Sequence, residues 1–279
     1  AYRAEFSDTN TTLARIDPGS GQPHRPLNVR IANRGHIWRT DPDNAVVIYD
    51  IVLTNVGLDP IDDGYIGFYM DADVFYNNGS INGFDDDLTG SIRSLGTAYI
   101  NDNDGDFDAA ANQGGKTTAR AFCFRMTGAS TPMADTNYNW WISNGYAPLD
   151  FGPRLRGTAE DPFRDLGTGG LGTPNGDANK YYFLRHREWD YDQIFTRSIE
   201  DDDTIWTVPP IPDLVDFADG FDTRFLLSVG PFDLAPGGSE RFVAAMFTAD
   251  STHGSPDNAD YPLRQPDFYL TRLALSRLA

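Results

Sequence analysis

The 279-residue chain lacks several features on which other protein classes depend. Its single cysteine, Cys123, cannot form a disulfide within the chain, and the apolar run around it predicts a small buried side chain. No apolar run approaches the roughly 20 residues of a transmembrane helix, so membrane insertion is not expected. With 22 bases against 41 acids the formal net charge is −19. This charge argues against nucleic acids and anionic membranes as partners, because both bind basic surfaces.

Glutamate and lysine are scarce as well. Only five of the acids are Glu and only two of the bases are Lys, whereas the chain has 27 glycines and 18 prolines. Glu and Lys populate helix surfaces, while Asp, Gly and Pro favour turns. The composition therefore predicts strands and loops with few helices. Its 40% hydrophobic residues are enough to form a core, which excludes a globally disordered chain.

Two pairs of apolar stretches show the clearest strand pattern. Residues 45–54 (AVVIYDIVLT) and residues 64–70 flank a turn rich in Asn, Gly and Pro, so they are predicted to form an antiparallel pair. Residues 224–229 and 240–248 form a second strand–turn–strand unit around PFDLAPGGS. Short strands separated by turn signals favour an all-β fold. The predicted architecture is a β-sandwich, immunoglobulin-like or jelly-roll-like, with long loops and a short C-terminal helix.

The chain divides into three predicted parts. Residues 1–44 are an N-terminal extension of strands, and residues 45–250 are the β-sandwich core with its Asp-rich loops. Residues 251–279 are a C-terminal extension with a helix, because apolar residues recur near its end at helical spacing. Within the core, residues 144–180 are rich in Gly, Pro and Asp and have little periodicity, which predicts a long insertion.

An acidic stretch at residues 62–108 contains eleven aspartates and a single base, Arg93. The acids fall at the ends of apolar runs and in Asn/Gly-rich turns, with almost no counter-charge nearby. Hard divalent ions prefer several carboxylate, amide and carbonyl oxygens, so calcium is the cation that this stretch predicts. The residues predicted to bind it are Asp71, Asp73, Asp85, Asp87, Asp102, Asp104, Asp106 and Asp108.

Residues 102–108 (DNDGDFD) resemble the start of a calcium loop. Oxygen ligands at alternate positions, with a glycine that permits a sharp bend, place Asp102, Asp104 and Asp106 around one point, and Asp108 follows. The glycine comes one place early and no Glu stands at the twelfth position, so the loop is not an EF-hand. The alternative interpretation is a solvated Asp-rich turn.

A second calcium site is predicted at the end of the strand that precedes residue 71. Asp71 and Asp73 share one side of that strand end, because side chains two residues apart point the same way. Asp85, Asp86 or Asp87 would complete this second site, or these acids would complete the site at residues 102–108. The alternative is that these acids end a strand and discourage pairing at its edge. The acidic run at residues 201–203 is interpreted as a solvated loop.

Catalytic motifs are sparse. The four histidines are scattered, and neither a zinc-binding HExxH nor a GxSxG or phosphate-binding loop is present. His186, Glu188 and Asp190 form one acid/base group beside Trp189, and paired carboxylates can hydrolyse glycosides. In a chain with so many aspartates, such pairs also arise by chance, so no enzyme is predicted.

Aromatic residues offer a further hypothesis, a platform on which sugars stack. The alternative is that paired aromatics place one ring in each face of a strand, and core aromatics are the more common case. The aromatics concerned are Trp140, Trp141, Tyr181, Tyr182, Trp189, Tyr191 and Trp206.

Three segments resemble a widespread group of secreted bacterial proteins that are largely uncharacterised and often carry C-terminal sorting domains for export. The segments are VVIYDIVLTNVGLDPIDDGYIGFYMDADV, FDDDLTGSIRSLGTAYINDNDGD and FDTRFLLSVGPFDLAPGGSERFVAAMF. They share with the group an aliphatic strand before a TN-G turn, an acidic DDD--G loop and a GPF-L-PG motif before an apolar strand. The resemblance covers about residues 45–250. It implies export and a β-sandwich-like fold, and it brings no catalytic residues to carry over.

Together these patterns predict a secreted, non-enzymatic structural protein braced by calcium, which assembles with copies of itself into a filament, tube or surface layer. The alternative is a calcium-stabilised carbohydrate-binding or adhesion module of a secreted system, with a polysaccharide as its ligand. A secreted glycan-processing enzyme is the least favoured interpretation.

Overall fold

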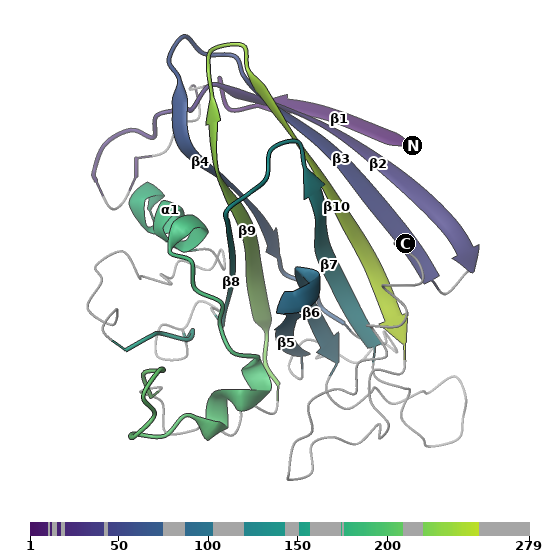
Figure 1. Cartoon of the computed structure of the whole chain (residues 1–279), viewed down its shortest axis with the longest axis vertical. Helices are drawn as coiled ribbons and strands as arrows, with labels where there is room; N and C mark the ends of the chain where they lie inside the picture. Colours follow the sequence, from purple (N-terminus) through teal and green to yellow (C-terminus); the bar gives the residue numbers. More distant parts are fainter. Residues whose placement is uncertain are drawn as a thin grey trace.

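The computed structural model describes residues 1–10, 12, 16–17, 20–41, 44–74, 87–102, 120–142, 151–156, 174, 176–208 and 220–250. These residues form β strands, one α-helix and short 3-10 helices (Figure 1). The strands are β1 (Tyr2–Ser7), β2 (Val29–Asp41), β3 (Asn44–Asn55), β4 (Ile61–Met70), β5 (Asp87–Ile92), β6 (Thr97–Asp102), β7 (Arg120–Ala129), β8 (Asp135–Ile142), β9 (Thr223–Leu234) and β10 (Ser239–Asp250). The helices are α1 (Asp177–Arg185), η1 (Arg93–Leu95) and η3 (Gln193–Ser198).

The strands form two antiparallel sheets that pack face to face, so the predicted all-β sandwich is confirmed. The large sheet has the strand order β1-β2-β3-β10-β7-β6-β5, and the small sheet has the order β4-β9-β8. Ile100 and Phe124 of the large sheet pack in one buried cluster with Tyr138, Phe225 and Leu227 of the small sheet. This apolar cluster between the sheets is the main core of the protein.

The prediction that residues 45–54 and 64–70 form an antiparallel pair is wrong. They belong to β3 and β4, which lie in different sheets, and the same is true of β9 and β10. Both connections therefore cross from one sheet to the other. A turn rich in Asn, Gly and Pro serves a hairpin and a crossing equally well, so the turn sequence alone does not distinguish them.

Asn55 joins the two crossings. It is completely buried, and its side-chain Nδ2 donates to the carbonyl oxygens of Asp59 (2.8 Å) and Leu234 (3.0 Å). Its backbone N–H donates to the Gly238 carbonyl at 3.0 Å, and Gly237 N–H donates to the Asn55 carbonyl at 2.9 Å. The TN-G turn and the PGG turn, which are far apart in sequence, thus form one hydrogen-bonded unit at the end of the sandwich.

The first two strands are an integral part of the large sheet. All of β1 pairs with β2, and β2 pairs with β3 from Val29 to Asp41. In β1 every residue except Ala4 is exposed. The predicted C-terminal helix, in residues 251–279, lies outside the described part of the chain.

Helix α1 covers the outer face of the small sheet (Figure 1). Its Phe183 packs in a buried cluster with Trp141 of β8 and Leu226 of β9. The helix begins at Asp177, so the last residues of the predicted insertion at 144–180 are helical. No helix in the described ranges is long and apolar enough to span a membrane.

Candidate metal site on the small sheet

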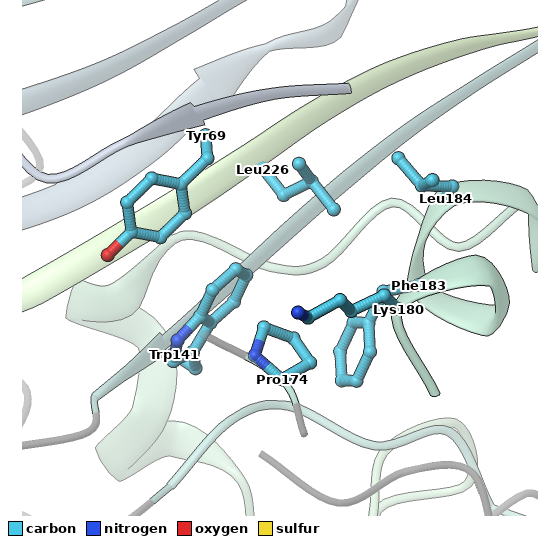
Figure 2. Close-up of a pocket in the computed structure, with 7 residues that line it drawn as sticks. All are labelled: Tyr69, Trp141, Pro174, Lys180, Phe183, Leu184 and Leu226. Carbon is cyan, nitrogen blue, oxygen red and sulfur yellow. The ribbon is translucent and has the colours of Figure 1, made fainter. Parts of the chain in front are cut away.

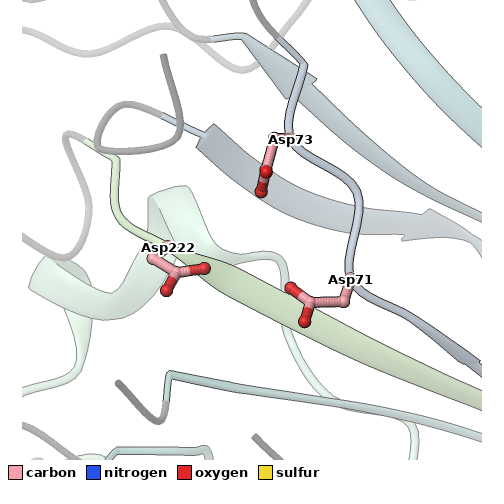
Figure 3. A group of neighbouring side chains, drawn as sticks. All are labelled: Asp71, Asp73 and Asp222. Carbon is pink, nitrogen blue, oxygen red and sulfur yellow. The ribbon is translucent and has the colours of Figure 1, made fainter. Parts of the chain in front are cut away.

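Three aspartates meet at one end of the small sheet (Figure 3). Asp71 and Asp73 follow β4 directly, and Asp222 directly precedes β9. Because β4 and β9 are antiparallel neighbours with Met70 opposite Phe225, the end of one strand lies beside the start of the other. Each residue offers one carboxylate oxygen within 4.8 Å of the others. We call these three residues the Asp71 cluster.

Arg224 is the described base that contacts the cluster. Its Nε lies 3.2 Å from Asp71 Oδ2 and its Nη2 lies 3.1 Å from Asp222 Oδ2. The side chain is only 10% exposed. Burial opposes its charge, but Asp222 and Asp71 outweigh burial and raise the pKa of Arg224. One guanidinium against three carboxylates leaves a surplus of negative charge when all are ionised.

Two carboxyl groups of the cluster, those of Asp222 and Asp73, have raised pKa values. Burial raises the pKa of Asp222 above its usual value, although Arg224 opposes the shift. Burial, followed by repulsion from Asp71, raises the pKa of Asp73. Both shifts mean that the protein holds these groups where their negative charge is disfavoured. A divalent cation at the cluster would relieve this cost, and three carboxylates with open sides match the oxygen ligands that calcium prefers.

Of the predicted ligands, the structure brings Asp71 and Asp73 together, and it adds Asp222, which the sequence interpretation missed. The only signal for Asp222 was that it precedes a strong strand; nothing in the sequence indicated that this strand pairs with β4. Asp87 lies beside the same region in another role. Its carboxylate accepts from Val74 N–H at 3.2 Å, and its carbonyl accepts from Phe221 N–H at 2.9 Å. It thereby fixes the chain on both sides of the cluster.

The calcium site predicted at residues 102–108 is not tested by the described part of the structure. Asp102 is the last residue of β6 and pairs through its backbone with Asp87, but its side chain is outside the described part of the chain. The remaining predicted ligands, Asp85, Asp104, Asp106 and Asp108, also lie outside the described residues.

The acidic run at residues 201–203 has a structural role in the described region. The Asp203 carboxylate accepts hydrogen bonds from the backbone N–H groups of Trp206 and Ile205, which lower its pKa. Arg156 donates to the carbonyl oxygens of Asp201 and Asp203. These contacts shape a surface turn.

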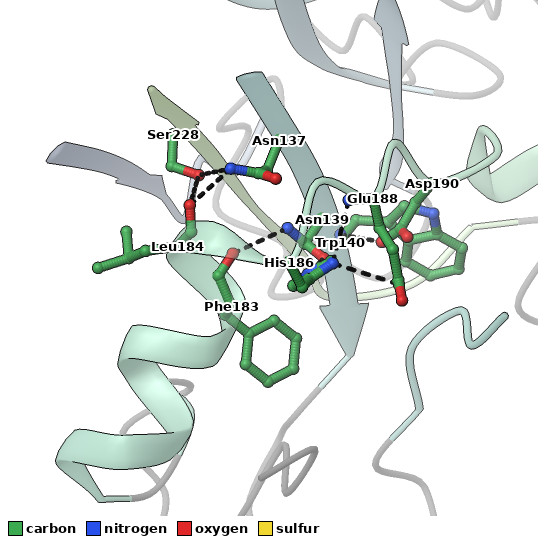
Figure 4. A network of polar contacts seen from close by, with 9 residues as sticks. All are labelled: Asn137, Asn139, Trp140, Phe183, Leu184, His186, Glu188, Asp190 and Ser228. Carbon is green, nitrogen blue, oxygen red and sulfur yellow. Dashed lines mark hydrogen bonds and ion pairs between the residues drawn. The ribbon is translucent and has the colours of Figure 1, made fainter. Parts of the chain in front are cut away.

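The acid/base group at residues 186–190 holds its own segment against β8 (Figure 4). Tyr138 N–H donates to the Glu188 carbonyl (3.1 Å) and Asp190 N–H donates to the Tyr138 carbonyl (2.9 Å), so this segment makes a single parallel bridge to β8. The Asp190 carboxylate accepts from Trp140 N–H at 3.0 Å. Glu188 and Asp190 are 4% and 3% exposed, so both carboxylates lie inside the protein.

His186 completes this network. Its Nδ1 accepts from Glu188 N–H at 3.1 Å, so its Nε2 carries the hydrogen that faces Asn139 Oδ1 at 2.6 Å. Asn139 in turn donates to the Phe183 carbonyl, and Asn137 donates to the Leu184 carbonyl. The end of α1 and the residues after it are thus bonded to β8 through buried side chains.

The adjacent tryptophans lie one in each face of β8. Trp140 points into the core between the sheets, and Trp141 points to the opposite face beneath α1. Both are at most 1% exposed. Tyr191 packs edge-on against Trp140 and Trp206. Of the aromatic residues considered for a sugar platform, Trp140, Trp141 and Tyr182 are therefore buried. Trp189, Tyr191 and Trp206 are partly buried, and Tyr181 is exposed.

A small apolar pocket lies between part of α1 and the small sheet (Figure 2). Its volume is about 180 Å³, and its lining residues are Tyr69, Trp141, Pro174, Lys180, Phe183, Leu184 and Leu226. Tyr69 connects the pocket to the Asp71 cluster, because its hydroxyl donates to Asp71 Oδ2 at 3.2 Å. Burial and the nearby Asp71 charge raise the pKa of Tyr69 to about 12. The pocket and the cluster are neighbours on one face.

Comparison with protein-family models finds no match to this chain, and a search of curated proteins finds none either.

Proposed function

We propose that the protein is a non-enzymatic, extracellular structural protein that assembles with copies of itself and is braced by calcium. The observation that carries the proposal is the exposed edge of the large sheet. Tyr2, Phe6 and Ile37, on β1 and β2, are 65%, 55% and 62% exposed, although they are large apolar residues. Exposed apolar side chains beside an unpaired strand edge favour contact with another protein chain.

The acid/base group at residues 186–190 makes contacts within the protein. Asp190 bonds a backbone amide of β8, and Glu188 lies buried beside His186. These contacts support a structural role for the acid/base group. The extracellular location is supported by the resemblance of three segments to exported bacterial proteins, which remains a prediction from sequence.

Calcium is the second part of the proposal. The Asp71 cluster joins the end of β4 to the start of β9, so a bound cation would cross-link two strands that meet only in the folded protein. A ligand that binds only the folded state stabilises it by mass action. The calcium site at residues 102–108 remains a prediction from the sequence.

Recognition of a glycan is the alternative function, and one observation favours it. Tyr69 lines the apolar pocket and also contacts Asp71, so a sugar could contact a bound cation and the apolar pocket at neighbouring positions. The pocket is small, and Trp141 at its base is fully buried. For that reason the structural role is the stronger proposal.

Negative-stain microscopy and thermal unfolding, each with calcium and with a chelator, test the proposal. We expect regular assemblies in calcium, and a lower melting temperature in chelator that corresponds to about 2–3 kcal/mol of lost stability relative to saturating ion. Replacing Asp73 and Asp222 by Asn should reduce the calcium shift, whereas the control Asp203→Asn should preserve it. Monodisperse monomers that bind polysaccharide in calcium would replace this proposal by the alternative. No bound metal by elemental analysis, and no change of melting temperature in chelator, would contradict the calcium part of both.

A further inference from the structure

The two edges of the large sheet differ among the residues that the structure describes. At the β5 edge, Thr89 N–H donates to Gln193 Oε1 (3.1 Å) and Ser91 N–H donates to Asp192 Oδ1 (2.9 Å). These two backbone amides of β5 are therefore already hydrogen-bonded to side chains and do not offer their N–H groups to an added strand. At the opposite edge, β1 pairs only with β2.

Both edges of the small sheet also carry features that hinder strand addition. The edge of β8 is bonded to residues 188–190. In β4 the pairing register shifts twice between Ile61 and Ile66, and the exposed Asp63 has a φ of 54°. Bulges and charges on an edge prevent pairing with another chain. By contrast, β1 is paired without a register shift and contains no proline.

The apolar side of β1 continues the core of the sandwich. Tyr2 and Phe6 lie on the same side of the sheet as Leu53, because Phe6 is opposite Ile31 and Ile31 is opposite Leu53. Leu53 belongs to the buried cluster that also contains residues of the small sheet. At β1 the aromatic side chains remain mostly exposed, so the apolar face extends beyond the part that the small sheet covers.

The sequence of β1 is complementary to itself when it is read in the opposite direction. In the stretch Tyr2-Arg-Ala-Glu-Phe6, antiparallel pairing centred on Ala4 places Arg3 opposite Glu5 of the second strand and Tyr2 opposite Phe6. Opposite charges and aromatic pairs across antiparallel strands are stabilising. We propose that β1 pairs with β1 of a second copy in this register and joins two large sheets across a two-fold axis at Ala4.

The net charge near β1 opposes contact with a second copy less than that of the rest of the chain. The chain as a whole carries a formal charge of −19, which opposes contact between most of its surfaces. Residues 1–39 are the exception, with six arginines and three acids. In the single chain, Glu5 has only long ion pairs, 3.7 Å to Arg3 and 3.9 Å to Arg30, and all three side chains are at least 48% exposed. They are free to turn toward a partner.

This inference rests on the proposed function, because it specifies the contact through which the protein assembles. A two-fold contact uses the same surface on both copies and is closed. The paired β1 strands therefore make a dimer, and a filament or layer would need a further contact between dimers. That separation allows the dimer contact to be tested apart from polymerisation.

A charge swap tests the register. Sedimentation equilibrium should show that Arg3→Glu and Glu5→Arg each raise the dimer dissociation constant about tenfold, because each variant places two like-charged pairs across the strands. The double variant Arg3→Glu/Glu5→Arg should return to within about threefold of the original, since each Glu again faces an Arg. A double variant that is as weak as the single variants would overturn the proposed register.

Disulfide formation tests the centre of the pairing. Residues directly opposite each other have Cα atoms about 4.5–5.5 Å apart, within reach of a disulfide, so Ala4→Cys should cross-link two copies under mild oxidation. The control Ser7→Cys would hold its two sulfurs roughly 20 Å apart and should not cross-link. The native Cys123 is fully buried and should not interfere.

The outcomes separate this inference from the function on which it rests. If copies associate but the Ala4→Cys variant does not cross-link and the charge swap does not restore binding, the β1 pairing is overturned while assembly stands. If no association occurs at any concentration, with or without calcium, both the pairing and the proposed assembly fail. Cross-linking of the Ala4→Cys variant together with recovery in the double variant supports the pairing.

Discussion

Asp190 and the Asp71 cluster (Asp71, Asp73 and Asp222) both lie beside strands of the small sheet, yet their surroundings differ. The Asp190 carboxylate is buried and accepts a hydrogen bond from the backbone of β8. In the cluster, three carboxylates face one another around a single guanidinium, that of Arg224, and two of them have raised pKa values. The Asp190 carboxylate binds a backbone amide of β8, whereas the carboxylates of the cluster share one guanidinium and the Tyr69 hydroxyl.

The difference shows why a count of acids says little about their role. A buried carboxylate is retained when donors of the protein itself surround it. Carboxylates that share one base and repel one another indicate a place for a cation. The Asp-rich composition therefore contains at least two kinds of site, and under the calcium proposal only the second kind should respond to calcium and chelator.

Removing Arg224 should have the largest effect on stability. In chelator, Arg224→Met is expected to lower the free energy of unfolding by about 3 kcal/mol, because loss of one partner leaves partly buried charges uncompensated. Calcium should recover much of this loss by replacing the guanidinium as the cation. Denaturant unfolding with calcium and with chelator measures both effects.

The matched control is Arg241→Met. Arg241 also pairs with an aspartate, its Nε lying 2.6 Å from Asp50 Oδ1, but its side chain is 59% exposed. Its loss should change stability far less, and calcium should not alter the result. Equal losses for the two variants, or no calcium recovery for Arg224→Met, would show that the cluster is an ordinary surface ion pair.

Replacing Asp190 should have the next largest effect. Asp190→Ala leaves Trp140 N–H without the carboxylate that it contacts at 3.0 Å, and we expect a loss of about 2 kcal/mol that calcium does not change. Asp190→Asn keeps an acceptor oxygen and should lose less. Urea unfolding of both variants measures the difference. A large calcium dependence of Asp190→Ala would mean that this carboxylate also belongs to a cation site.

The sequence predicted the strands better than their partners. Residues 45–54 and 64–70 are strands because their apolar residues suit a pleated, half-buried surface, and that pattern is local. Their assignment to different sheets depends on β9 and β10, which come much later in the chain. The buried amide of Asn55 links both crossings, and nothing adjacent to it in sequence reveals its distant partner, Leu234.

In the candidate site, too, only the residues that are close in sequence were predicted together. Asp71 and Asp73 were identified because they are near each other in sequence at a strand end. Asp222 was missed because it reaches them only through the pairing of β4 with β9. Residues of the same type can have different roles, and their burial and contacts in the fold distinguish these roles. The group at His186, Glu188 and Asp190 has the composition of an acid/base set, and only the fold shows that its members bond the backbone of β8 and of their own segment.

Glu240 offers the smallest and most specific test, because it is a satisfied carboxylate on the large sheet. It is 5% exposed and accepts hydrogen bonds from Ser130 Oγ, Thr131 Oγ1 and Thr131 N–H. Burial acts to raise its pKa, but these donors outweigh burial and hold the pKa of Glu240 below its usual value of 4.5. The ionised form is therefore favoured by folding.

A group whose pKa is lower in the folded state contributes stability above its unfolded pKa and loses it as the pH falls through the folded value. Glu240→Gln should therefore be about 1 kcal/mol less stable than the original protein at pH 7. The difference should shrink as the pH falls below 4.5, because protonated Glu240 loses its advantage over Gln. Unfolding of both proteins across this range cancels the titration of the other acids. A difference that stays constant down to about pH 3 would contradict the lowered pKa, and a difference that disappears in chelator would place Glu240 with the cation-dependent carboxylates instead.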